Sequence, residues 1–218
     1  MSNKNSNTPV IDITPEPEKE YEMRFIIWKT KDIEMMDFEG TSDVYCRTFL
    51  DPDEDHLTDT HWRNQNGKAS FNWRNLIKIK SKQDQYLLNI QCWDKDIFAS
   101  DEIIGSFSLD VWPIFEDCIL TDKLQTFSSD YWNSYMKNQL IERGYEFADK
   151  IEFEKEDKEL FWVPMYRFNE EEGKDKISGY VQCSFRIYPK ASAEKNKQGV
   201  GRDEPNNDPV LPEPEGRL

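Results

Sequence analysis

The sequence predicts an all-β fold: an eight-stranded antiparallel sandwich that carries a partly helical insertion. The first observation is a series of short β-prone segments in which apolar and polar residues alternate, as they do along half-buried strands. The second is that polar or glycine-containing loops separate most of these segments, a spacing typical of sandwiches. The expected strands are 23–28, 44–50, 57–63, 71–79, 86–93, 104–110, 160–166 and 179–188.

The interval 111–159, between the sixth and seventh expected strands, breaks this spacing. A helix is indicated there by a capping segment, Ser128-Ser129-Asp130, followed by apolar residues at helical spacing. These residues are Trp132, Met136 and Leu140, with Tyr135 alongside. We expect the stripe to pack on the sandwich, and the alternative is a helix that binds a partner.

The chain of 218 residues has room for one generous domain or two small ones, and one domain with an insertion is the simpler interpretation because both ends look unstructured. Residues 1–20 are polar, with two prolines near Thr14, and residues 189–218 are rich in Pro, Asn, Glu and Gly. We therefore predict a flexible N-terminal lead-in over 1–20, one domain over 21–188 with its insertion at about 111–159, and a flexible C-terminal linker over 189–218.

The net charge of −15 argues against general nucleic-acid binding, which needs a basic surface. It also argues against constitutive adhesion to anionic lipid, unless a divalent cation reverses the charge locally. The four cysteines form no CxxC pair and only two histidines are present, so we expect free thiols in a reducing compartment and no zinc site. No apolar run approaches the ~20 residues of a membrane span. We expect this fragment to be soluble and cytosolic.

An enzymatic role is not expected, and we predict no catalytic residues. The sequence has no GxSxG motif, no phosphate-cradling glycine loop, and too few histidines for a histidine-based catalytic constellation. A glycosidase would use paired carboxylates, but nothing in the sequence marks a sugar-binding groove.

Acidic residues concentrate in two segments, each beside an expected strand end. If these ends meet at one end of the sandwich, the carboxylates converge and repel one another, and a hard cation such as Ca²⁺ relieves that cost. The candidate metal ligands are Asp37, Asp43, Asp94, Asp96, Asp101 and Glu102. Apolar residues stand among the acids, as in loops that enter a bilayer interface. The candidate membrane-inserting residues are Met35, Met36, Phe38, Ile97 and Phe98, although some of them could instead pack inward.

These acidic segments resemble the calcium loops of C2 domains. The segment from Asp37 to Asp43, with its Gly-Thr-Ser-Asp, is similar to the first C2 calcium loop, and 93–105 is similar to the third. The resemblance implies five acidic Ca²⁺ ligands. By position they are Asp37, Asp43, Asp94, Asp96 and Glu102. The fifth departs from the usual aspartate, so Asp101 could replace Glu102.

Two further segments resemble the ferlin family. Thr58-Asp59-Thr60-His61, followed by Gly67 and then Phe71-Asn72-Trp73-Arg74, is similar to ferlin membrane-proximal C2 domains. Residues 193–205 are similar to the ferlin segment that joins the last C2 domain to its transmembrane helix. The resemblance covers 22–110 and 160–210 and is weak over 111–159.

The ferlin resemblance implies a Ca²⁺-dependent, phospholipid-binding C2 domain that acts in vesicle fusion or membrane repair. Its implied partners are anionic membranes containing phosphatidylserine or phosphoinositides, with the other C2 domains of a tail-anchored parent as further candidates, at the cytoplasmic face. The alternative is a Ca²⁺-independent protein-interaction module that uses the 111–159 insertion.

A basic strand face is a second candidate lipid site, of the kind that binds phosphoinositide head groups in many C2 domains. The residues concerned lie on or just after one expected strand, and the first three share a face by their even spacing. They are Arg74, Lys78, Lys80 and Lys82. The alternative interpretation is a solvated strand face.

Overall fold

The computed structural model describes residues 14–36, 40–142, 144 and 158–217. The strands are β1 (Glu20–Lys31), β2 (Ser42–Phe49), β3 (His56–Leu57), β4 (His61–Asn64), β5 (Ser70–Lys80), β6 (Leu87–Asp94), β7 (Glu102–Asp110), β8 (Gln125–Thr126), β9 (Phe161–Asn169) and β10 (Lys174–Pro189). The helices are α1 (Trp112–Thr121), α2 (Ser129–Glu142) and α3 (Lys190–Lys195). Within this described part of the chain, no helix is long and apolar enough to span a bilayer.

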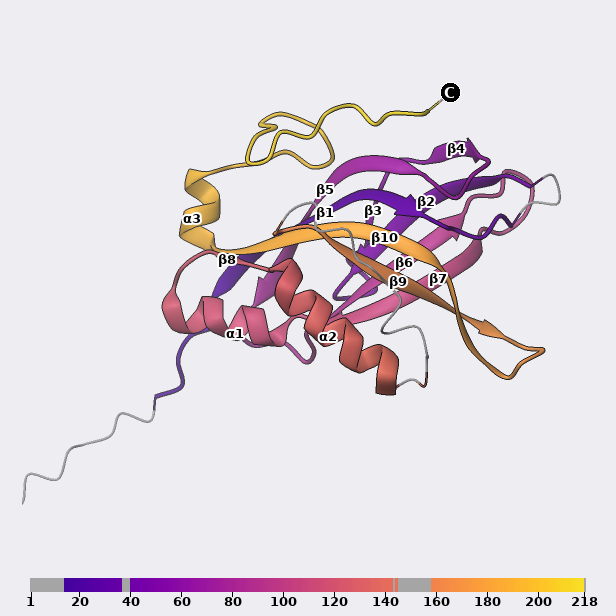
Figure 1. The fold of residues 1–218 in the computed structure, drawn as a ribbon. Coiled ribbons are helices and arrows are strands. Elements are labelled where there is room, and N and C mark those ends of the chain that lie inside the picture. Colours follow the sequence, from indigo (N-terminus) through magenta and orange to yellow (C-terminus); the bar gives the residue numbers. More distant parts are fainter. Residues whose placement is uncertain (1–13, 37–39, 143, 145–157, 218) are drawn as a thin grey trace, which may run out of the picture.

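The expected antiparallel sandwich is confirmed, with eight principal strands hydrogen-bonded in the order β3-β2-β6-β7-β9-β10-β1-β5 (Figure 1). The ladder is thin at one point, because β7 and β9 share a single residue pair, Ser106 with Tyr166. This weak junction divides the order into β3, β2, β6 and β7 on one side and β9, β10, β1 and β5 on the other, the two layers of the sandwich. Alternate side chains of both layers fill one core.

The expected strand 57–63 is in fact two short strands, β3 and β4. Thr58 causes the break, because its hydroxyl accepts the amide of Cys46 at 2.9 Å and donates to the carbonyl of Asp59 at 2.8 Å. A side chain thereby takes over a hydrogen bond that a regular ladder would make between backbones.

The insertion contains α1, β8 and α2, and its apolar stripe packs inward as expected. The Ser128 hydroxyl accepts the amide of Tyr131 at 3.2 Å, as a capping residue does. Trp132 and Met136 are fully buried, and the Trp132 indole donates to the Trp162 carbonyl at 2.8 Å. The side chain of Leu140 and residues 145–157 lie outside the described residues.

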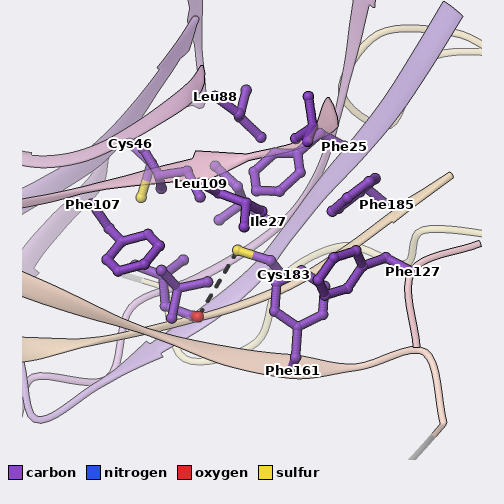
Figure 2. Close-up of a cluster of buried hydrophobic side chains, with 14 of the residues drawn as sticks. Phe25, Ile27, Cys46, Leu88, Phe107, Leu109, Phe127, Phe161, Cys183 and Phe185 are labelled. Atoms are coloured by element: carbon purple, nitrogen blue, oxygen red, sulfur yellow. Dashed lines mark hydrogen bonds between the residues drawn. The ribbon is translucent and has the colours of Figure 1, made fainter. Parts of the chain in front are cut away.

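The insertion also completes the core, as Figure 2 shows. Phe127, which follows β8, lies 4.6 Å from Phe185 and 5.0 Å from Phe161 between ring centroids. All four cysteines are buried and free. The contact with Cys92, followed by burial, raises the pKa of the Cys46 thiol, and burial, followed by Cys92, raises that of Cys183. Both shifts favour the protonated thiol.

The described residues 189–217 pack in part on the sandwich, whereas the sequence predicts a flexible linker over 189–218. After α3 this segment turns back over the outer face of β5, where it is the yellow segment above that strand in Figure 1. The Arg74 backbone pairs with Gly201 in both directions, at 3.3 and 2.8 Å. Leu211 is buried, so part of this polar segment belongs to the domain's packing. Of the predicted lead-in, residues 1–13 lie outside the described residues, and β1 begins at Glu20.

Candidate functional site

The expected convergence of strand ends occurs at one end of the sandwich. There β1 runs into β2, β4 into β5, and β6 into β7. We call this end the loop pole; its described residues are 32–36, 40–43, 61–69 and 94–102. Strand register brings its parts together, because Val44 pairs with both Asp94 and His61, and Asp94 pairs with Glu102.

Asp94 and Asp43 form the inner part of the loop pole. Asp94 is only 5% exposed, and its Oδ1 accepts the amide of Asp43 at 2.6 Å. Oδ1 of Asp43 in turn accepts the amide of Arg63 at 2.6 Å. A buried carboxylate is costly unless it is hydrogen-bonded or paired with a cation, and here backbone amides provide part of that compensation.

Asp96 and Asp101 shape the loop between β6 and β7. Oδ1 of Asp96 accepts the amides of Phe98 and Ala99 at 2.7 and 3.0 Å. Oδ1 of Asp101 accepts the Asp96 amide at 3.1 Å, and its Oδ2 accepts the Tyr45 hydroxyl at 2.8 Å. Burial, followed by the hydrogen bond and charge of Asp101, raises the pKa of the Tyr45 phenol. Asp101 therefore has a structural role, whereas the neighbouring Glu102 is exposed.

The chemistry of these side chains suits a hard cation, since Ca²⁺ takes carboxylate oxygens at flexible distances. The described residues do not complete a site on their own, however. Among them, no three His, Cys, Asp or Glu side chains are grouped closely enough to hold a metal ion. Asp37, the remaining ligand that the C2 resemblance implies, lies outside the described residues. Ca²⁺ binding thus stays a prediction.

The candidate membrane-inserting residues differ in their surroundings. Ile97 and Phe98, at the tip of the β6–β7 loop, are 70% and 98% exposed. Met36 is half-buried, packs against the core, and places its sulfur 2.9 Å from the Arg167 guanidinium. Met35 is also half-buried, and Phe38 lies outside the described residues. Among the candidates that the structure describes, only Ile97 and Phe98 at the β6–β7 tip present large apolar side chains to solvent.

The expected basic strand face needs a correction at Arg74. This side chain is fully buried beneath the C-terminal segment, and its Nη2 donates to the carbonyls of Asn207 and Pro209 at 3.1 and 2.6 Å. Burial, followed by the charge of Arg24, lowers the pKa of Arg74. Arg74 therefore cannot meet a lipid head group in this arrangement.

The three lysines of that face are exposed, but acidic residues stand beside them. Lys78 lies opposite Glu22 and Lys80 opposite Glu20 in the β1–β5 ladder. Lys80 is also 3.5 Å from Glu18, and the Lys82 ammonium donates to a backbone carbonyl of the N-terminal segment. The local charge is therefore mixed.

Sequence reasoning missed two features near the site. One is the cluster in which Arg202 and Arg217 of the C-terminal segment bind Asp59. The other is that Trp62 and Arg63 are both exposed at the loop pole. In a regular strand, two consecutive side chains point to opposite faces, so one of this pair would be buried. No sequence signal indicates that both are exposed.

Comparison with known proteins agrees with this geometry. Residues 21–125 match the C2 domain family. The antiparallel sandwich and this match together show a C2-type fold, and the chain is distantly similar to the ferlins. The chain is 28% identical over 231 residues to myoferlin of Homo sapiens and 26% identical over 234 residues to myoferlin of Xenopus tropicalis.

These alignments include 93% and 94% of this chain but only 11% of each myoferlin, so the chain spans about a ninth of these relatives. Among solved structures, a C2 domain of plant extended synaptotagmin 1 matches with a TM-score of 0.45 at 11% identity. That match covers 77% of this chain and 94% of the plant domain.

Proposed function

We propose that this C2 domain docks on anionic phospholipid membranes through the loop pole and that Ca²⁺ switches the docking. The observation that carries the proposal is the exposure of Ile97 and Phe98 at the tip of a loop whose shape is set by Asp96 and Asp101. Apolar side chains held out in water gain free energy when a loop tip enters a bilayer interface.

The negative charge of the domain is the reason to expect that membrane docking depends on Ca²⁺. The chain has a net charge of −15, and Asp43, Asp94 and Asp96 add negative charge at the pole itself. These residues, with Asp37 and either Glu102 or Asp101, are the ones that would hold Ca²⁺. The bound ion would neutralise them and attract lipid phosphate or carboxylate groups. Phosphatidylserine and phosphoinositides are the proposed lipids, in the setting of vesicle fusion or membrane repair that ferlin relatedness implies.

The two driving forces are of similar size. Full burial of a side chain such as Phe98 contributes roughly 1.5–3 kcal/mol, and less at a wet interface. Each net positive charge near an anionic surface contributes about 1 kcal/mol. We therefore expect that neither term alone holds the domain on the membrane.

The test is co-sedimentation with phosphatidylserine vesicles, combined with calorimetric titration of Ca²⁺. Asp94→Asn with Asp96→Asn should abolish both Ca²⁺ binding and Ca²⁺-dependent sedimentation. Ile97→Ala with Phe98→Ala should weaken sedimentation about tenfold and leave Ca²⁺ affinity in solution unchanged.

A matched control removes the same number of charges elsewhere. Asp51 and Asp53 lie in the turn after β2, at the end of that strand away from the loop pole. Asp51→Asn with Asp53→Asn should behave as the wild type. The proposal is wrong if the Asp94/Asp96 variant still sediments with vesicles as the wild type does.

A further inference from the structure

Strand β4 presents two consecutive side chains to solvent, against the alternation of a regular strand. Trp62 and Arg63 are exposed, while His61 and Asn64 on either side are buried. The β2–β4 ladder shifts register between Ser42 and Val44, and Arg63 adopts φ 52°. An irregularity of this kind re-aims side chains, and it often lies beside functional sites.

A carboxylate of the loop pole holds this irregular backbone in place. The Arg63 amide donates to Oδ1 of Asp43 at 2.6 Å. A left-handed conformation is unfavourable for a residue with a long side chain, so it persists only where surrounding contacts impose it. Asp43 is also one of the predicted Ca²⁺ ligands, so the strand irregularity and the candidate metal site share a residue.

The same strand lies beside the start of the β6–β7 loop, at Lys95. The Lys95 ammonium is 5.7 Å from the centroid of the Trp62 ring, and the Lys95 amide donates to the Asp43 carbonyl at 2.9 Å. Lys95 stands two residues before Ile97. Trp62, Arg63 and Lys95, which we call the β4 flank, thus combine an aromatic ring with two exposed cations in a strongly acidic chain.

We propose that the β4 flank is a second membrane contact, which seats Trp62 in the interfacial region and binds anionic lipid through Arg63 and Lys95. An indole ring suits that region because it has an apolar body and one polar N–H group. Guanidinium and ammonium groups form charge-assisted hydrogen bonds with phosphate and carboxylate oxygens. This inference rests on the proposed membrane docking, and it adds contacts on the side of the pole formed by β4.

Trp62→Ala should weaken Ca²⁺-dependent partitioning into phosphatidylserine vesicles about tenfold, because the ring is 45% exposed and available for burial. Arg63→Gly should weaken it about fivefold, the ratio that corresponds to ~1 kcal/mol per charge at the surface. Glycine accepts the backbone conformation of Arg63, so this variant removes the charge without unfolding the strand. Calorimetric Ca²⁺ affinity in solution should stay unchanged in Trp62→Ala.

Two control variants match these changes away from the pole. Tyr131→Ala on α2 removes an aromatic ring that is 43% exposed, and Lys123→Ala removes an exposed cation. Neither should alter partitioning. In addition, brominated lipid should quench part of the wild-type tryptophan fluorescence, and that part should be missing in Trp62→Phe.

The outcomes separate this inference from the proposed function. If wild-type protein binds the vesicles with Ca²⁺ while Trp62→Ala and Arg63→Gly partition like their controls, the β4 flank is no membrane contact and the docking proposal stands. If wild-type protein fails to bind vesicles at any Ca²⁺ concentration, both proposals are wrong. Weaker partitioning of the two flank variants alone, with loss of quenching in Trp62→Phe, supports the inference.

Discussion

Replacing Asp59 by asparagine should release the C-terminal segment from the sandwich. The two oxygens of Asp59 accept bonds from Arg217 at 2.6 and 2.8 Å and from Arg202 at 2.7 Å. The same arginines also donate to the carbonyls of Ser70 and Phe71 on β5. The asparagine side chain would lack the negative charge that both guanidinium groups share.

The expected loss follows from the number and exposure of these bonds. A hydrogen bond to a charged group contributes about 1.5–3 kcal/mol when buried, and partly exposed ion pairs contribute much less. The Asp59 side chain is 27% exposed, so we expect Asp59→Asn to lower the free energy of unfolding by about 2 kcal/mol in total. Urea denaturation measures that change, and hydrogen exchange at the amides of Arg74 and Gly201 should rise, since these two residues pair with each other.

A matched control and a pH series sharpen the test. Asp55→Asn removes a single exposed pair with Arg47 and should change stability by less than about 1 kcal/mol. Burial raises the pKa of Asp59, but the bonds from Arg217 and Arg202 outweigh it and lower the pKa overall.

Because the folded pKa is the lower one, this stabilisation is present above the unfolded pKa of about 3.9 and is lost as pH falls through the folded value. The difference between wild type and Asp59→Asn should therefore shrink below about pH 4. Equal urea midpoints for the two proteins at pH 7, or a difference that grows as the pH falls below about 4, would refute this reasoning.

Three other variants test separate parts of the structure. Trp132→Ala removes a fully buried ring that lies 4.9 Å from Phe161, and it should lower the free energy of unfolding by about 3–5 kcal/mol in urea; a loss below about 1 kcal/mol would contradict the packing of α2. Tyr45→Phe removes the donor to Asp101 and should speed hydrogen exchange over 96–101 while leaving the fold intact, as heteronuclear spectra would show. Lys78→Ala with Lys80→Ala should change vesicle binding less than twofold, because Glu20 and Glu22 lie opposite these lysines; a tenfold loss in sedimentation would restore the basic strand face as a lipid site.

The strands were predictable because their pattern is local. Along β2, for example, buried and half-exposed residues alternate from Ser42 to Thr48, and the sequence shows the same alternation. The stripe on α2 was predictable for the same reason, since Trp132 and Met136 are four residues apart and preceded by a capping serine. The break in 57–63 was not, because it depends on which backbone groups the Thr58 hydroxyl meets across the sheet.

The environment of Arg74 shows why part of the candidate site could not be predicted. Its even spacing with Lys78 and Lys80 correctly placed the three on one strand face. Its burial depends on carbonyl groups more than 130 residues away, at Asn207 and Pro209. The proline- and asparagine-rich composition of the C-terminal segment does not predict that this segment packs over β5. The proximity of Asp43 and Asp94, by contrast, was predictable, because strand pairing alone brings these two residues together.

The most direct measurement is co-sedimentation of the wild-type chain with phosphatidylserine vesicles, carried out at saturating Ca²⁺ and again in excess chelator. Membrane docking switched by Ca²⁺ predicts a sedimented fraction that is large with Ca²⁺, near background with chelator, and near background on neutral phosphatidylcholine vesicles under both conditions. Equal sedimentation with and without Ca²⁺ on phosphatidylserine would contradict the switch, and no sedimentation under either condition would contradict the docking itself.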